Sequence, residues 1–354
     1  MRIGLDVMGG DHAPHAILQG AIQAIDLLDD NDRLVLFGEE AVIRAGLRDK
    51  CLERDPRIEV HPTKEAIGMN DSPVEAVRTM RRSSLVVMAR EASRHALPGK
   101  RLDAIISAGN TGACVSAAQM FMRRLPSVHR PGIAVIVPTF HGPIVIIDVG
   151  ANIQPKPHHL AQYGIMGDVY IRHIVGVKNP RIAIMNVGSE EQKGTAEMQQ
   201  ARDFLRRDDS VNFIGYVEGR AVFDGAADVV ITDGVVGNVM IKLAEGLSAG
   251  IFKALAREVM KTDPELAKRL EPIVKSIYAK HDYHEYGGAP LLGVNGICLI
   301  SHGSSEARTI KAAVRNARQV ASTGVNEAIA RRLTAMEAKE ESATALTGVG
   351  GLGE

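Results

Sequence analysis

The stretch Ile3–His12, with the sequence Ile-Gly-Leu-Asp-Val-Met-Gly-Gly-Asp-His, sets the pattern that most of the chain repeats. A short apolar run ends in a carboxylate, and a glycine-rich turn follows it. Four to six apolar residues bounded by turn residues are typical of a buried strand. A strand with a polar loop at its carboxyl end, followed by a helix, is the repeating unit of a parallel α/β sheet.

The same unit recurs along the rest of the chain, with helix-like segments between the apolar runs. This alternation predicts a three-layer α/β/α fold with a mainly parallel sheet. Only Thr139–Gly142 separates two of the runs, which predicts an antiparallel hairpin there. The further predicted strands are Leu34–Gly38, Ile58–His61, Ala104–Ser107, Ile133–Pro138, Ile144–Asp148, Ile182–Asn186, Val211–Ile214 and Val229–Asp233.

We expect one large α/β domain over residues 1–334, or two lobes of it, with a protruding helical hairpin near 239–280. The stretch Thr262–Glu265 breaks the first helix of this hairpin and caps the second. Residues 335–354 are rich in Ala, Glu, Thr and Gly, and we expect a disordered tail there. Large apolar residues recur every fourth position and form one helical face, namely Leu243, Leu247, Ile251, Leu255 and Val259.

That apolar face, with Lys and Arg interspersed, favours packing against a second copy of the chain or contact with a membrane surface. Plain packing against the core explains part of the same pattern.

Composition narrows the class of protein. The formal net charge is zero, so global charge gives no reason to expect a nucleic-acid partner. The three cysteines, Cys51, Cys114 and Cys298, are far apart, which argues against a disulfide framework and fits a reducing cytoplasm. The first residues show no signal-peptide pattern, and no uninterrupted apolar run reaches about 18 residues, so we expect no bilayer-spanning segment.

Glycine and asparagine follow the strands at the carboxyl edge of the predicted sheet, where α/β proteins bind ligands. Glycine lets backbone N–H groups approach an anion, and a helix that starts there adds its positive end. Each loop alone is an ordinary turn, but their recurrence after five strands predicts a phosphate and oxyanion site. The candidate substrate- and phosphate-binding residues are Asp6, Gly9, Gly10, Asp11, His12, Asn110, Thr111, Asp148, Asn152, Asn186, Gly188, Glu190, Asp233, Gly234, Gly237, Asn295 and His302.

Two side chains in these loops suit acyl or phosphoryl chemistry. Lys193 could neutralise phosphate or a developing oxyanion, or it is a solvated surface lysine. Asn238 could donate to a carbonyl or phosphate oxygen, or serve as a helix N-cap. In the first loop, Asp6, Asp11 and His12 could do acid–base work, or Asp11 caps the next helix and His12 is simply a satisfied polar residue.

Several familiar sites are missing from the sequence. It contains no GxxxxGK[ST], GxGxxG or GxSxG motif. Asp148 and Asp233 could share a metal ion, but neither HExxH nor dense carboxylate spacing supports this, so we expect no metal and no cofactor.

Basic residues crowd two segments, 78–101 and 123–130. They could dock an acidic protein or the phosphate of phosphopantetheine, or form a solvated helix face. These residues are Arg78, Arg81, Arg82, Arg90, Arg94, Lys100, Arg101, Arg123, Arg124 and Arg130.

Taken together, the loops resemble those of the bacterial acyl-carrier-protein:phosphate acyltransferase family (PlsX type). The resemblance runs in order over about residues 1–333 and leaves the tail outside. The segments that carry it are Ile3–Pro14, Ser107–Ala113, Asp148–Asn152, Asn186–Gly194, Asp233–Val239, Leu291–Asn295 and His302–Ser305.

The resemblance implies an enzyme that forms acyl phosphate reversibly from acyl-carrier protein and inorganic phosphate, by direct attack of phosphate on the thioester. The product would feed a membrane glycerol-3-phosphate acyltransferase in phospholipid synthesis. A cytoplasmic, peripherally membrane-associated homodimer is implied, with a fold similar to isocitrate and isopropylmalate dehydrogenases and to phosphotransacetylases. Lys193 and Asn238 are implied as the catalytic pair. The alternatives are a nicotinamide-dependent dehydrogenase and a non-catalytic module that binds carrier protein or lipid.

Overall fold

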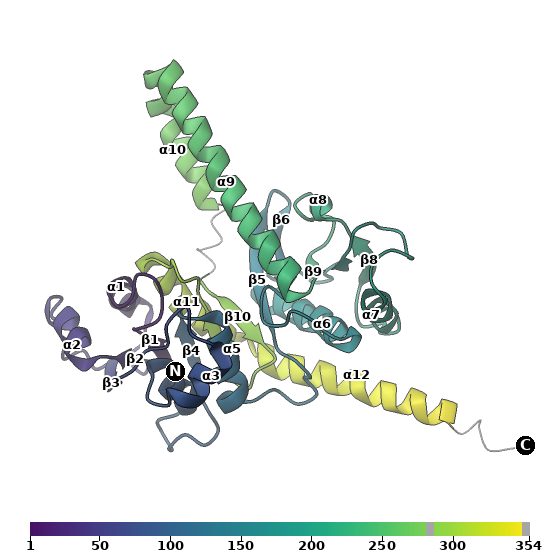
Figure 1. Cartoon of the computed structure of the whole chain (residues 1–354), viewed down its shortest axis with the longest axis horizontal. Coiled ribbons are helices and arrows are strands. Elements are labelled where there is room, and N and C mark those ends of the chain that lie inside the picture. Colours follow the sequence, from purple (N-terminus) through teal and green to yellow (C-terminus); the bar gives the residue numbers. More distant parts are fainter. Residues whose placement is uncertain (281–286, 349–354) are drawn as a thin grey trace, which may run out of the picture.

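The computed structural model describes residues 1–280 and 287–348. In these residues, eleven strands form one sheet in the order β3-β2-β1-β4-β11-β10-β5-β6-β9-β7-β8 (Figure 1). The strands are β1 (Arg2–Asp6), β2 (Arg33–Gly38), β3 (Ile58–Pro62), β4 (Ala104–Ser107), β5 (Gly132–Thr139), β6 (Gly142–Ile147), β7 (Ile182–Met185), β8 (Phe213–Val217), β9 (Val229–Ile231), β10 (Ala289–Leu292) and β11 (Ile297–Ile300).

The predicted mainly parallel sheet is confirmed. Strand β10 runs antiparallel to both β11 and β5, and β5 runs antiparallel to β6, while the other neighbours are parallel. The predicted hairpin is therefore the β5–β6 pair. We call β1–β4 with β10 and β11 the first half of the sheet, and β5–β9 the second half.

The sequence reasoning missed β10 and β11. Each is only four residues long, and the glycine-rich turn between them was read as a ligand-binding loop. The strand predicted at 211–214 begins later, at Phe213.

Helices cover both faces of the sheet, which confirms three layers. One apolar core joins the sheet to α1, α6, α7, α11 and α12, a second lies under α3–α5, and a third lies under α8 and the base of α9. The helices are α1 (His15–Gln23), α2 (Glu40–Arg48), α3 (Pro73–Thr79), α4 (Ser84–Glu91), α5 (Thr111–Ala117), α6 (Pro157–Ile174), α7 (Ala196–Arg206), α8 (Gly219–Val222), α9 (Gly234–Thr262), α10 (Pro264–Lys280), α11 (Ala307–Thr323) and α12 (Val325–Gly348), with short helices η1 (Ile25–Leu27) and η2 (Ala118–Met122).

Helices α9 and α10 form an arm that protrudes from the rest of the molecule (Figure 1). Asp263 caps α10 by accepting hydrogen bonds from the N–H groups of Glu265 and Leu266. Most of the apolar face predicted for α9 is exposed, since Leu243 is 66% exposed and Leu247 is 60% exposed. The arm therefore presents an apolar stripe to the outside.

Helix α9 also bears on the expectation of no bilayer-spanning segment. Among the described residues it is the one helix long and apolar enough to cross a membrane, judged by length and composition only, with a mean hydropathy of 1.4 over its most apolar window. The sequence reasoning looked for an uninterrupted apolar run and so passed over a helix that contains Lys242 and Glu245.

The C-terminal helix differs from the expectation of a disordered tail from residue 335, because α12 continues to Gly348. The remainder of that predicted tail, residues 349–354, lies outside the described residues. Arg332 of α12 pairs with the fully buried carboxylate of Asp168 at 2.7 Å, and Arg172 contacts the same carboxylate at 2.9 Å. These ion pairs fix the first part of α12 against α6.

Candidate active site

Asp6 holds together two loops of the first half. Its buried carboxylate accepts hydrogen bonds from Ser84 Oγ at 2.6 Å and Ser107 Oγ at 2.8 Å. Burial raises the pKa of Asp6, and the two serine hydroxyls oppose that shift. A Cβ at Gly9 would lie 2.5 Å from the Asp6 carboxylate and 2.9 Å from the N atom of Gly109, so only glycine fits where these loops cross.

Asn110 also serves the protein's own structure. Its Oδ1 accepts from Ala113 N and caps α5, while its Nδ2 donates to the carbonyls of Met69 and Asp71, both at 3.1 Å. The amide is thus engaged within the protein, and it fixes the loop that carries Met69 beside α5.

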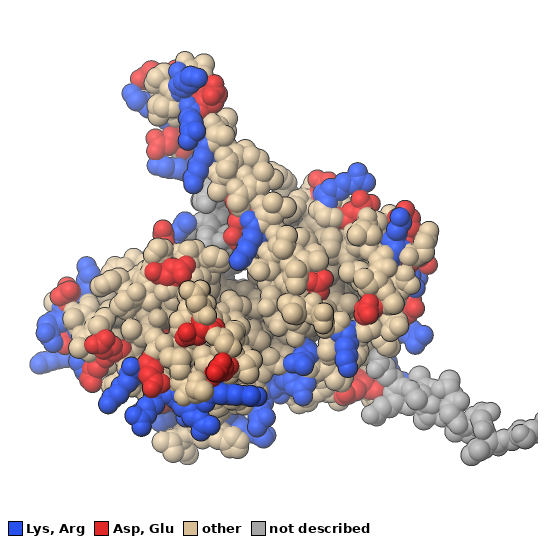
Figure 2. Space-filling model, in the orientation of Figure 1, with Lys and Arg blue, Asp and Glu red and all other residues tan. Residues whose placement is uncertain are grey.

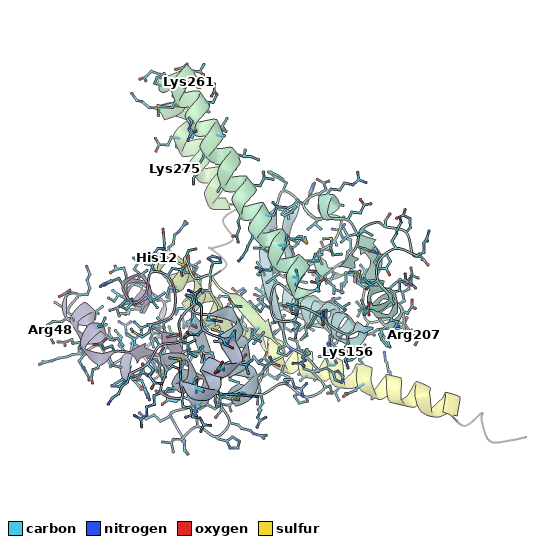
Figure 3. The ribbon with its side chains drawn as sticks, viewed as in Figure 1. His12, Arg48, Lys156, Arg207, Lys261 and Lys275 are labelled. Carbon is cyan, nitrogen blue, oxygen red and sulfur yellow. The ribbon has the colours of Figure 1, made fainter. Side chains whose placement is uncertain are left out.

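Asp11 joins the first loop to the last one, since its N–H donates to the carbonyl of Gly303 at 2.8 Å. The residue preceding α1 is Pro14, which makes no side-chain cap, so Asp11 does not cap that helix. Asp11, Thr111 and His302 line a common cavity. His12 lies at the edge of the first half that faces the arm, whereas Lys156 lies on the opposite side of the molecule (Figure 3).

The Asp148 loop, residues 148–156, is the counterpart in the second half. The Asp148 carboxylate accepts from the N–H groups of Ile133 (2.9 Å), Gly150 (3.2 Å), Ala151 (3.0 Å) and Asn152 (2.7 Å). Burial raises the pKa of Asp148, and these N–H donors act in the opposite direction. Asn152 Nδ2 donates to the carbonyl of Pro131 at 2.7 Å, so both predicted binding side chains hold the loop itself.

Helix α9 begins directly on this loop. Asp233 Oδ1 accepts from Val235 N and Val236 N, both at 2.9 Å, so Asp233 is the N-cap and the N-cap reading of Asn238 is wrong. A Cβ at Gly237 would meet the Asp148 carbonyl oxygen at 2.1 Å, which explains a glycine there. Asn238 is one residue further along, and its side chain lines the cavity.

The Lys193 loop, residues 186–195, follows β7. Asn186 is buried; its Oδ1 accepts from Val187 N at 2.8 Å, but its Nδ2 has no hydrogen-bond partner among the described residues. Gly194 lies against this amide, and a Cβ there would be 2.7 Å from Asn186 Oδ1. Lys193 is exposed and makes no ion pair within residues 1–280 and 287–348.

Of the loop's other candidates, Glu190 folds towards Gly188, where a Cβ would meet Glu190 Oε2 at 2.4 Å. Lys193 does not line the cavity that contains Asn238. The two come from adjacent elements, because β7 pairs with β9, and β9 leads into α9.

Asn295 must be removed from the predicted site. It belongs to the turn between β10 and β11, at the end of β11 opposite to Ser301, and it lines a separate cavity with Met1 and Arg318. The missed strands explain the error, because β10 runs antiparallel and its following turn lies at the amino edge of the parallel strands.

The cavity at the carboxyl edge has a volume of about 460 Å³ and lies between the two halves. Strand β5, the end of β11 and the underside of α9 supply apolar walls, while the loops supply polar groups. Among the latter, Ser301 is buried and its Oγ has no hydrogen-bond partner in the described part of the chain. Ser301 is not among the residues predicted for the site; it directly follows β11, and its N–H donates to the carbonyl of Ser107, the last residue of β4, at 2.9 Å.

A family profile described as fatty acid synthesis protein matches residues 1–328. The chain is 42% identical over 328 residues to a phosphate acyltransferase of Bacillus licheniformis, covering 92% of this chain and 96% of the relative. It is 41% identical over 329 residues to a phosphate acyltransferase of Bacillus subtilis, again covering 92% and 96%.

Among solved structures, a phosphotransacetylase from Streptococcus pyogenes matches with a TM-score of 0.59 at 15% identity, over 90% of this chain and 94% of that one. A branched-chain phosphotransacylase from Enterococcus faecalis matches with a TM-score of 0.55 at 11% identity, over 91% and 99%. At these identities the likeness concerns the fold, and it agrees with the predicted similarity to phosphotransacetylases.

Proposed function

This chain belongs to the fatty acid synthesis protein family, and we propose that, as a phosphate acyltransferase of that family, it forms acyl phosphate reversibly from acyl-[acyl-carrier protein] and inorganic phosphate. The product would supply a membrane glycerol-3-phosphate acyltransferase in phospholipid synthesis.

One observation carries the phosphate side of this proposal. Asn186 Nδ2 is a buried donor that finds no acceptor among the described residues, and the exposed cation Lys193 belongs to the same loop. A buried donor left unpaired costs free energy, so such a group is expected to meet an acceptor when the site is filled. An anion beside Lys193, such as phosphate, would supply that acceptor.

The reaction requires no covalent enzyme intermediate, because a thioester is already activated. A phosphate oxygen attacks the acyl carbonyl carbon, a C–O bond forms, and the C–S bond then breaks. The thiolate leaves and takes up the proton that the attacking phosphate loses. Lys193 and Asn186 would hold phosphate, and the Asn238 amide would donate to the tetrahedral oxyanion.

The test is to incubate the protein with acyl-carrier protein and phosphate. Free carrier thiol and hydroxylamine-trappable acyl phosphate should appear together and depend on phosphate. A dehydrogenase would instead change the absorbance of a nicotinamide, and a binding module would bind carrier protein without consuming thioester. A radiolabelled acyl group trapped on any Ser or Cys would overturn direct attack.

For the acyl donor, we propose that carrier protein docks on the basic surface, defined as the ten Arg and Lys residues of segments 78–101 and 123–130 named above. Elsewhere in the chain, Arg57, Arg181 and Arg206 each pair with a carboxylate. None of the ten basic-surface residues forms an ion pair with the described acidic residues. Figure 2 shows Lys and Arg gathered along the edge of the first half that carries α3 and α5. Unpaired positive charge of this kind attracts an acidic partner.

For the arm, we propose two contacts. The stripe nearest the site, Val239 and Leu243, would be covered by a second copy in a homodimer. The outer part combines exposed Met260 with lysines, including Lys261 and Lys275 (Figure 3), and would rest on an anionic membrane surface. The protein would then be cytoplasmic and peripherally associated with the inner face of the cell membrane.

A further inference from the structure

The cavity beside Asn238 has two kinds of wall. Its apolar wall includes Ile133 and Val135 of β5, Ile300 of β11 and Ile241 of α9. Its volume of about 460 Å³ lies within the range of roughly 300–1,000 Å³ that is usual for small-molecule sites. Apolar walls of this extent bind a hydrocarbon more readily than they bind inorganic phosphate.

The polar contribution comes from opposite sides. Asn238, Lys242 and Glu245 line it from the second half, along the base of α9, and Ser301 lines it from the first half, at the end of β11. Ser301 is 2% exposed, and its Oγ has no hydrogen-bond partner among the described residues. A buried hydroxyl that lines a cavity and lacks a partner points to a ligand that carries an acceptor.

The neighbouring Ser305 provides an internal comparison. It too is buried, at 1% exposure, and its Oγ also lacks a partner in the described part of the chain. Ser305, however, does not line the cavity. The two serines thus share burial and an unpaired hydroxyl, and they differ in access to the cavity.

We propose that this cavity is the acyl subsite, in which a fatty acyl chain lies along the Ile133, Val135 and Ile241 wall and the Ser301 hydroxyl donates a hydrogen bond to the thioester carbonyl. This rests on the proposed function, and it adds the location of the acyl chain and a second donor opposite Asn238. A chain that fills an apolar cavity of this size is a medium or long one, so the enzyme discriminates against acetyl groups.

Two serine variants test the donor. Ser301→Ala should lower kcat by roughly 100-fold with little change in KM, the usual effect of losing one donor to an oxyanion. Ser305→Ala should keep wild-type kcat. Both variants should melt at or above the wild-type temperature, because each removes a buried hydroxyl that has no partner. Equal kcat in Ser301→Ala and Ser305→Ala would overturn the assignment of Ser301.

A cavity-filling variant tests the chain. Val135→Phe should lower kcat/KM for hexadecanoyl thioester at least about ten-fold while leaving the butanoyl thioester close to wild type. Loss of rate that is equal for both chain lengths would overturn the acyl subsite. Wild-type protein that makes no acyl phosphate from any thioester would instead refute the proposed function, so the two failures are distinguishable.

Discussion

The Asp148 loop and the Lys193 loop follow β6 and β7, the two neighbours of β9, and so flank the base of α9 on the same edge of the sheet. They differ in how their polar groups are used. The Asp148 carboxylate is fully buried and surrounded by backbone N–H groups. The Lys193 loop is exposed from Ser189 to Thr195, and Asn186 Nδ2 has no hydrogen-bond partner among the described residues.

The difference separates two kinds of polar loop that look alike in sequence. The polar groups of the Asp148 loop form hydrogen bonds within the protein, whereas the Lys193 loop keeps a donor that could bind a ligand. Substitutions in the first loop should therefore alter stability, and substitutions in the second should alter activity.

The largest effect is expected for Lys193→Ala. We expect kcat to fall roughly 100- to 1000-fold, because the charge that we propose stabilises the transition state is lost. The free energy of unfolding should stay within about 0.5 kcal/mol, as for other exposed positions. Thioester consumption and urea unfolding measure the two quantities. Lys178→Ala, at the opposite end of β7, is the matched control and should be active. A fully active Lys193→Ala protein would contradict the proposed role of the Lys193 loop in activity.

Asp148→Ala should be the most destabilising change. It leaves several buried N–H groups without an acceptor, so we expect a loss of about 3 kcal/mol in the free energy of unfolding. Asp148→Asn keeps one acceptor oxygen and should lose less. Urea denaturation followed by circular dichroism measures both, and an unchanged midpoint for Asp148→Ala would contradict the structural role of this loop.

Asn186→Asp keeps the oxygen that accepts from Val187 N and replaces the unpaired donor with a negative charge. We expect weaker phosphate binding by about 2 kcal/mol, or roughly 30-fold in KM for phosphate. Steady-state kinetics with varied phosphate measure this, with KM for the acyl donor as the internal control. If KM for the acyl donor rises instead, the Lys193 loop binds the other substrate.

The smallest effect concerns His159, whose Nδ1 accepts from Lys156 N at the far end of the Asp148 loop. Burial, with His158 and Arg130 nearby, lowers the pKa of His159 to about 4. The unfolded chain takes up this proton near its ordinary pKa of about 6.5, whereas the folded protein resists it down to about 4. Stability is therefore complete above about pH 6.5 and falls as the pH drops towards 4.

His159→Asn keeps a possible acceptor without a titrating group, so its melting temperature should depend less on pH in that window. Thermal denaturation at a series of pH values measures this. Parallel pH profiles for the wild type and the variant would exclude His159 as the source.

The strand pattern and the glycine loops were sufficient to predict the α/β layers and the β5–β6 hairpin, and they placed the candidate site at the edge of the sheet where the cavity lies. Periodicity alone captured these features because the buried strands are bounded by turn residues. Four-residue strands such as β10 carry too little pattern, and missing β10 placed Asn295 at the wrong edge.

Residue type alone could not predict whether a polar side chain forms hydrogen bonds within the protein or is left to bind a ligand. Asp148 and Asn186 both follow buried strands, yet one is saturated with donors and the other is not. Asn110 and Asn238 both stand near helix starts, yet only Asn110 is a cap, because Asp233 already occupies that position for α9. Ser301 has no sequence motif that points to a ligand. It becomes a candidate binding residue only because its buried Oγ has no hydrogen-bond partner among the described residues.

The contact between Gly237 and the Asp148 carbonyl oxygen has a mechanical consequence. Helix α9 starts in van der Waals contact with the sheet edge and continues for 29 residues, a length of about 44 Å at the usual helical rise. We expect this close contact to restrict bending at the base of the helix, so that its outer end stays at a set distance from Asn238. If the tip rests on a surface, as proposed, the arm would act as a spacer that sets the height of Asn238 above it.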